Sequence, residues 1–110
     1  MIEFLYNYQN IIHYGLHFIA PGLLAFLFFK NYWKKAWLIM LGTMIVDLDH
    51  LLANPVFDPE RCSIGFHLLH TPYAIIIYIA FVCTPHKWLR IIGLGLLFHM
   101  LTDYIDCLLI

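Results

Sequence analysis

The chain has 110 residues with a formal net charge of −1; 63% of them are hydrophobic and 12% are charged. Its length fits a single domain, and its hydrophobic content lies well above that of ordinary soluble domains. Only six residues are Lys or Arg, so the sequence offers no basic surface for nucleic acid. We therefore expect residues 1–110 to form one small integral membrane domain.

Four apolar segments are predicted as membrane-spanning helices, over residues 11–29, 36–53, 66–83 and 89–110. Each is close to the roughly 20 residues that cross a hydrocarbon core. The connections are short, so successive helices should be antiparallel neighbours. The predicted fold is all-α, a four-transmembrane-helix antiparallel bundle in contact with membrane lipids. The alternative, a soluble helical bundle, is disfavoured because no segment has a charged solvent face. Gly42 and the Gly93-x-Gly95 pair would allow close helix contacts, including those of a homo-oligomer.

Basic residues predict the orientation of these helices. Lys30, Lys34 and Lys35 lie in the first connection, and Lys87 and Arg90 lie at the third. The positive-inside rule places both connections in the cytoplasm, with the interfacial tryptophans beside them. Both termini and the second connection then lie on the outer, periplasmic side of a bacterial inner membrane.

Histidine and aspartate residues occur in all four predicted spans. Ionisable side chains are costly in a bilayer unless they bind a partner or a metal. Within a span, spacings of three or four residues place side chains on one helix face. Asp49 departs from this pattern, since it points about 200° away from Asp47 on an α-helix. Pro21 lacks an N–H and is predicted to kink the first span after His17. In the predicted orientation ten residues fall toward the outer face: His13, His17, Asp47, Asp49, His50, His67, His70, His99, Asp103 and Asp106.

Imidazole and carboxylate ligands together suit zinc, iron or manganese, and helical bundles build such sites from pairs three or four residues apart. We expect a divalent metal site, most plausibly for zinc, with Fe or Mn as alternatives. Because zinc takes four protein ligands or fewer, the set is too large for one ion. Either two ions are bound or some residues orient the ligands, a role open to Asp106. A proton relay or a polar packing network is the competing interpretation. The predicted ligands are His13, His17, Asp47, Asp49, His50, His67, His70, His99 and Asp103.

Two features of the outer side have alternative interpretations. Cys62 and Cys107 either form a disulfide, which would persist in an oxidising compartment, or remain separate buried thiols, the favoured reading. Arg61, shortly before His67, either binds a substrate phosphate or is a solvated loop residue that pairs with Asp58 or Glu60.

The run Asp47-Leu48-Asp49-His50, followed by His67, His70 and His99-x-x-x-Asp103, resembles the YdjM-like family of predicted membrane-bound metal-dependent hydrolases. The chain is also similar to a family of short four-pass bacterial membrane proteins of unassigned function. YdjM-like proteins are thought to be distantly similar to zinc phospholipase C and P1-type nucleases. They usually carry H-R-G-x-[ST]-H, where this chain has His67-Leu68-Leu69-His70. The resemblance implies as metal ligands His13, His17, Asp49, His50, His70, His99 and Asp103.

The expected activity is metal-dependent hydrolysis, with a phosphoester of a lipid or envelope component as substrate at the outer face. A bound metal would lower the pKa of a water molecule and polarise the phosphoryl group. Asp49 or Asp103 would then act as general base. The alternatives are metal transport or sensing, and a di-iron oxidoreductase resembling the His-box membrane desaturases.

Overall fold

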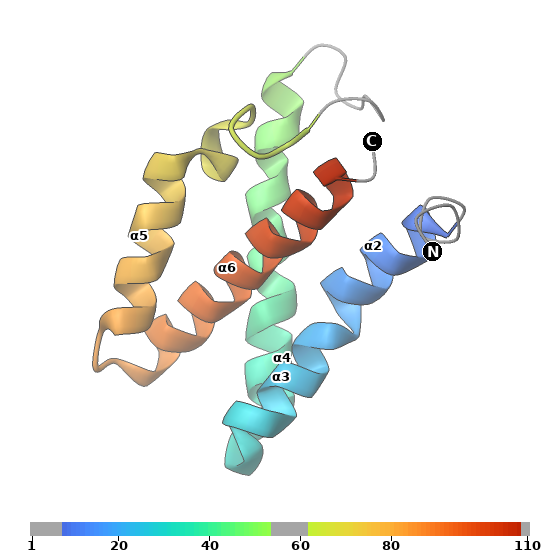
Figure 1. Ribbon diagram of the computed structural model, residues 1–110. Coiled ribbons are helices and arrows are strands. Elements are labelled where there is room, and N and C mark those ends of the chain that lie inside the picture. The colour runs from blue at the N-terminus through green and yellow to red at the C-terminus, as the bar shows by residue number, and fades with distance from the viewer. Residues whose placement is uncertain (1–7, 54–61, 109–110) are drawn as a thin grey trace.

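The computed structural model describes residues 8–53 and 62–108, and the regular elements of these residues are all helices with no strand, which confirms the all-α class (Figure 1). Four helical segments follow one another. In Figure 1 the first and third connections between them lie at one end, and the start of α2 and the end of α6 lie toward the other. The elements are α2 (Gln9–Phe18), α3 (Ala20–Phe28), η1 (Lys30–Tyr32), α4 (Trp33–Gly42), η2 (Thr43–Leu52), η3 (Leu68–His70), α5 (Pro72–Cys83) and α6 (Lys87–Leu108).

Two helical stretches, Ile11–Phe28 and Lys87–Leu108, are long and apolar enough to cross a membrane. The predicted third span is wrong in its first part, because α5 begins at Pro72 and has only 12 residues. Proline disfavours the α conformation in the residue before it, and Thr71 is accordingly extended, with φ −80° and ψ 161°. The Thr71 hydroxyl also accepts a hydrogen bond from the Ala74 N–H, 3.4 Å away. His67 and His70 therefore lie in a turn and a short 3₁₀ helix ahead of α5.

The second segment changes from α-helix to 3₁₀ helix at Thr43 and continues so to Leu52. The α-helical geometry expected over the whole of this segment is therefore wrong for the part that holds Asp47, Asp49 and His50. The Thr43 hydroxyl donates to the Met40 carbonyl, a side-chain bond that competes with regular helix hydrogen bonding. A 3₁₀ helix has three residues per turn, and runs of more than three or four residues are uncommon. Ten consecutive residues in this form mark an unusual segment at the position of the Asp-x-Asp-His run.

The first segment is interrupted between α2 and α3, as Pro21 predicts. Pro21 is buried at the start of α3, and its missing N–H leaves the His17 carbonyl without a helical partner. The Gly22 N–H bonds to the Ile19 carbonyl at 2.9 Å. Across the helix pair, the Trp37 indole N–H donates to the Phe18 carbonyl at 2.8 Å. A side chain of α4 thus supplies a hydrogen bond at the break.

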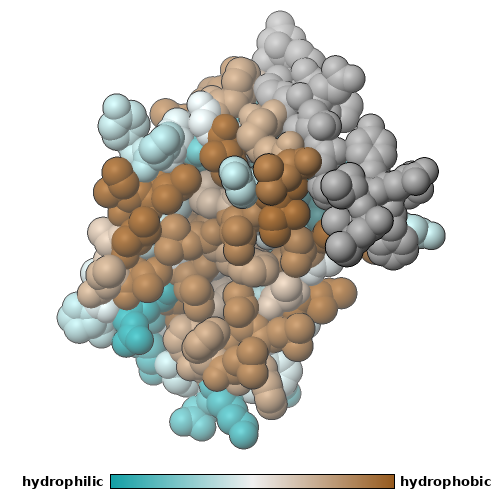
Figure 2. Space-filling view, in the orientation of Figure 1, coloured by the Kyte–Doolittle hydropathy of each residue, from teal (hydrophilic) through white to brown (hydrophobic). Residues whose placement is uncertain are grey.

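Apolar side chains form two core clusters and also cover much of the surface. One cluster joins α3, α4 and α6 and comprises Ala25, Ala36, Met40 and Ile91. The other lies between η2, α5 and α6 and comprises Val46, Ala74, Tyr78, Leu96 and Met100. Many large apolar side chains are exposed, and Figure 2 shows them across the middle of one face, with hydrophilic residues at the lower end. Such extensive exposed apolar surface marks a membrane or protein contact.

Gly93 allows α5 and α6 to pack backbone against backbone. A Cβ at Gly93 would lie 2.8 Å from the Tyr78 carbonyl oxygen and 2.9 Å from the Val82 nitrogen. Gly95 has the same role toward α4, because its Cβ would lie 3.1 Å from the Met40 Cα. The Gly93-x-Gly95 pair is therefore used for contacts within one chain.

Replacing Gly93 with alanine is expected to lower the thermal unfolding midpoint of the protein in detergent. Inside a helix, replacing glycine with alanine normally stabilises the folded protein by about 1 kcal/mol. Forcing a methyl group into a packed interface destabilises it by about 1–3 kcal/mol. Gly15→Ala in α2 is the matched control, because a Cβ there meets nothing within 4 Å. Gly15→Ala should leave the midpoint unchanged or higher, and equal midpoints for the two variants would contradict the packing argument.

Candidate metal centre

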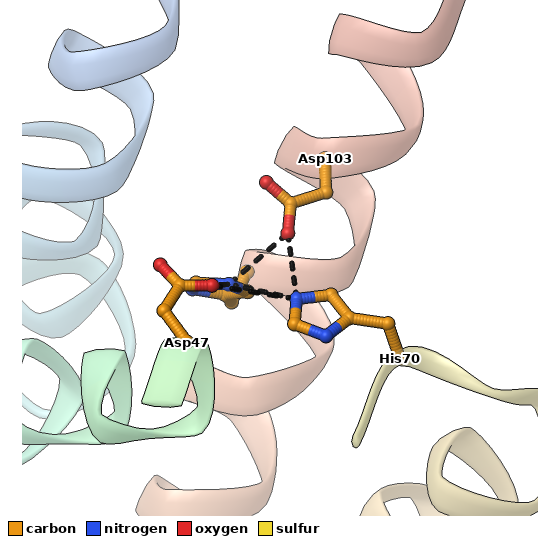
Figure 3. Close-up of side chains that lie close together, drawn as sticks. Asp47, His70 and Asp103 are labelled. Carbon is orange, nitrogen blue, oxygen red and sulfur yellow. Dashed lines mark hydrogen bonds and ion pairs between the residues drawn. The ribbon is translucent and has the colours of Figure 1, made fainter. Parts of the chain in front are cut away.

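Four side chains from three elements place their ligand atoms together in what we term the central group: Asp47, His70, His99 and Asp103. Asp47 comes from η2, His70 from η3 and the other two from α6, and the labelled residues point toward one another in Figure 3. The His99 Nε2 lies 3.0 Å from Asp47 Oδ1 and 3.1 Å from Asp103 Oδ2. The His70 Nε2 lies 2.9 Å from the same Asp103 oxygen and 3.5 Å from Asp47 Oδ1. The ligand atoms of all four residues lie within 4.8 Å of one another.

Burial differs sharply within the central group. His70, His99 and Asp103 are 0%, 2% and 5% exposed, whereas the Asp47 side chain is 37% exposed. Buried charges require compensation by a partner or a metal. Asp47 is the member of the group that solvent reaches most readily.

A second set, the His13 group, contains His13, His17 and Asp103. The His17 Nε2 lies 3.2 Å from Asp103 Oδ1, so the two oxygens of this carboxylate face different groups. The His17 ring lies 4.4 Å from the His13 ring and 4.3 Å from the His99 ring, between centroids. The His17 imidazole of α2 therefore lies next to the imidazole of His99 in the central group.

A third set, the Asp49 group, contains Asp49, His50 and His67. Asp49 Oδ2 accepts hydrogen bonds from His70 Nδ1 and from the Leu69 N–H, both at 2.8 Å. Asp49 Oδ1 lies 3.1 Å from His50 Nδ1, and the rings of His50 and His67 stack with centroids 3.8 Å apart. Asp49 thus contacts the central group through His70 Nδ1, the ring nitrogen that does not face Asp47.

The Asp49–His70 bond fixes the direction of the His70 lone pair. An ionised carboxylate only accepts hydrogen bonds, so His70 Nδ1 carries the proton and, in the neutral ring, Nε2 presents a lone pair to the central group. Metal-ligating histidines are commonly held this way, by a carboxylate on the other ring nitrogen. The facing ring nitrogens of His70 and His99 are 3.3 Å apart. Electron-rich atoms converge here, which requires a shared proton or a cation between them.

The hydrogen bonding of Asp103 Oδ2 tests independently whether the central group fits a metal ion. It is buried and lies within 3.1 Å of two ring nitrogens, yet it accepts no hydrogen bond from any residue that the structure describes. The contacts are close in distance but poorly directed for hydrogen bonds. Two His nitrogens and two carboxylate oxygens form a donor set suited to four-coordinate zinc, and iron and manganese accept the same atom types. The central group can therefore hold a metal ion.

The three groups bring together all nine predicted ligands. Asp106 lies beside them, where it accepts a hydrogen bond from Gln9 Nε2 at 2.7 Å and lies 3.7 Å from His13 Nδ1. Arg61 and its neighbours Asp58 and Glu60 fall outside the described residues. Gln9 and Tyr78 were not predicted to take part. The Tyr78 hydroxyl donates to the Leu69 carbonyl at 2.8 Å and so fixes the His70 segment on α5; the sequence holds no local signal for this contact.

Cys62 and Cys107 form a disulfide with a Cα–Cα distance of 4.9 Å. The favoured prediction of two separate buried thiols is therefore wrong. The two cysteines lie 45 residues apart in sequence, so only the tertiary structure brings Cys62 to the end of α6. The bond ties the segment that carries His67 and His70 to the helix that carries His99 and Asp103.

A family model described as "Family of unknown function (DUF6122)" matches residues 7–110. No curated protein matches the chain, and no solved structure does. The resemblance to YdjM-like hydrolases stays a prediction.

Proposed function

Since the chain belongs to the DUF6122 family, whose function is unknown, we propose from the site itself that it is a membrane-embedded, metal-dependent hydrolase. The observation that carries the proposal is the convergence of two ring nitrogens and two carboxylate oxygens in the central group. It is supported by the carboxylate that orients His70. A buried but partly open His and Asp centre is the arrangement that metal-dependent hydrolysis requires.

Two independent features support an outward-facing site in a bilayer. At one end of the molecule, Lys87 lies 4.6 Å from the centre of the Trp88 ring and 4.5 Å from that of Tyr32. Basic and aromatic residues together are typical of a cytoplasmic membrane interface. Lys87 begins α6 and Cys107 lies in its last turn, so the Cys62–Cys107 disulfide lies at the opposite end of this helix. Disulfides persist in oxidising compartments such as the periplasm. Both features support our proposal that the metal centre lies nearer the outer face of an inner membrane.

The short helix α5 fits this arrangement. Twelve residues span only about 18 Å at 1.5 Å per residue, less than the roughly 30 Å of a hydrocarbon core. The turn-rich segment before α5 would then lie at membrane depth. Non-helical backbone is tolerated there when it is buried in protein or lines a polar cavity. The buried His67 and His70 give this segment such a role.

The residues of the central group have separable roles in hydrolysis. When bound, a divalent ion polarises a phosphoryl oxygen and acidifies a water molecule. His70, His99 and Asp103 would hold the ion, and Asp49 would keep His70 in the tautomer that binds it. Both carboxylates predicted as the general base, Asp49 and Asp103, are buried and contact histidines. We therefore assign proton acceptance from water to Asp47, the most exposed carboxylate of the group, which leaves three protein ligands and an open position for the water.

The apolar core between α3, α4 and α6 favours a hydrolase over a metal transporter. This core lies between the central group and the end of the molecule that carries Lys87. Ala25, Ala36, Met40 and Ile91 are buried there with aromatic side chains packed against them. No polar path continues from the central group through this part of the described structure. A phosphoester of a lipid or envelope component, reaching the centre from the outer leaflet, is the substrate class that we propose.

The test uses the full chain purified in detergent and returned to nanodiscs. Elemental analysis identifies the bound metal and separates zinc from iron. The protein is then assayed against phospholipids and soluble phosphomonoesters and phosphodiesters, before and after treatment with a chelator. We expect hydrolysis that is lost with the metal and restored by it. A fully metallated protein that leaves the whole panel intact, or one that conducts zinc in proteoliposomes, would overturn the proposal.

A further inference from the structure

We propose that a second divalent ion binds between α2 and α6, held by His13, His17 and Asp103, and that Asp103 bridges it to the ion of the central group. This inference rests on the proposed metal centre. It assigns the His13 group as a binding site and makes the catalytic centre dinuclear.

The first argument is the division of Asp103 between the two groups. Its Oδ1 lies 3.2 Å from His17 Nε2, and its Oδ2 lies 2.9 Å from His70 Nε2 and 3.1 Å from His99 Nε2. A carboxylate that serves a single ion presents one or both oxygens to the same point. Asp103 instead presents one oxygen to each of two sets of ring nitrogens, which is the arrangement of a bridging ligand.

A second, independent argument comes from the unpartnered polar atoms. His13 Nδ1 is buried and forms no hydrogen bond with any described residue, although Asp106 lies 3.7 Å away. His13 and His17 are four residues apart in α2, so their side chains lie on one helix face, and His17 is itself buried. Ligand atoms of His13, His17 and Asp103 lie within 4.8 Å of one another. Three ligands from protein, with a further position open, is the coordination of a catalytic zinc.

The number of carboxylates near the three groups also favours two divalent ions. Four carboxylates, those of Asp47, Asp49, Asp103 and Asp106, lie in or beside the three groups, and each contacts a histidine within the described residues. No Lys or Arg of the described residues pairs with them; the ion pairs at the site are all between His and Asp. Two of these carboxylates, Asp49 and Asp103, are buried, and buried negative charge requires cations. Two divalent ions would balance four carboxylates with neutral imidazoles, whereas one ion would leave two negative charges.

A bridged pair of ions also narrows the substrate class. Two adjacent ions can stabilise both the attacking and the leaving oxygen in a phosphoryl displacement. A phosphodiester or phosphomonoester uses both ions in this way. A dinuclear centre would therefore favour phosphoesters over other hydrolysable substrates.

The experiment titrates metal-free protein with Mn²⁺ and measures both the stoichiometry and the electron paramagnetic resonance spectrum. The wild-type protein should bind two equivalents with a spin-coupled signal. His17→Ala should bind one equivalent with the signal of an isolated Mn²⁺. His13→Ala, a change at a less buried side chain, should give the same result if His17→Ala fails to fold. His86→Ala is the control, because His86 is exposed and lies in the connection before α6; it should retain two coupled ions.

The outcomes separate this inference from the proposed metal centre. One equivalent in the wild type, retained in His17→Ala and lost in His99→Ala, would overturn the second site and leave the central group intact. Two equivalents without spin coupling would overturn the bridging role of Asp103. Absence of binding in every variant, the wild type included, would overturn both proposals.

Discussion

Replacing His99 with alanine is expected to weaken metal binding at the central group by about 100-fold and to abolish metal-dependent hydrolysis. His99 is buried, and its Nε2 lies within 3.1 Å of both carboxylates of the group. Structural zinc sites with four protein ligands bind with about 10–16 kcal/mol. A single ligand therefore contributes roughly 3 kcal/mol, or about a 100-fold change in affinity. Competition with a zinc chelator of known affinity measures the loss.

Asp49→Asn gives the matched comparison for His99→Ala, because it keeps the four side chains of the central group and changes the carboxylate that orients His70. Removal of such an orienting carboxylate typically costs about 10–100-fold in metal affinity or activity. Leu101→Ala is the control on α6, since Leu101 is half exposed on its apolar surface; it should bind metal like the wild type. Unchanged affinity in His99→Ala, or equal losses in all three variants, would contradict the assigned roles.

Reducing the Cys62–Cys107 disulfide is expected to lower both the stability of the protein and its metal affinity. The bond closes a loop of about 45 residues, for which chain entropy gives about 4 kcal/mol of stabilisation. Reduction would also free the segment from Cys62 to His70, which supplies His70 to the central group and His67 to the Asp49 group. The measurements are the denaturant midpoint in detergent micelles and the metal dissociation constant, each with and without reductant.

The double variant Cys62→Ser and Cys107→Ser should reproduce the effect of the reductant and should no longer respond to it. Cys83→Ser is the control, because Cys83 is a free and exposed cysteine; this variant should behave like the wild type under both conditions. If the double variant kept the midpoint and the metal affinity of the oxidised wild type, the disulfide would have no part in holding the site.

Local sequence determined much of the candidate site. The i, i+4 pairs His13 with His17 and His99 with Asp103 lie on single helix faces whatever surrounds them, and the structure places both pairs in the groups as expected. The break after His17 follows from Pro21, whose missing N–H acts locally. Thr71-Pro72 carries an equally local signal, since the residue before proline avoids the α conformation. This local signal predicts a helix that begins at Pro72, which is where α5 begins.

Tertiary structure decided how these local pairs combine. No local signal shows that one oxygen of Asp103 faces α2 and the other faces η3, because this depends on the packing of three separate segments. The pairing of Cys62 with Cys107 and the bond from Tyr78 to Leu69 likewise join residues that the chain order keeps apart. The sequence by itself determined which residue types would gather and on which helix faces. Only the packing distances between helices, set at points such as Gly93, determined which atoms meet.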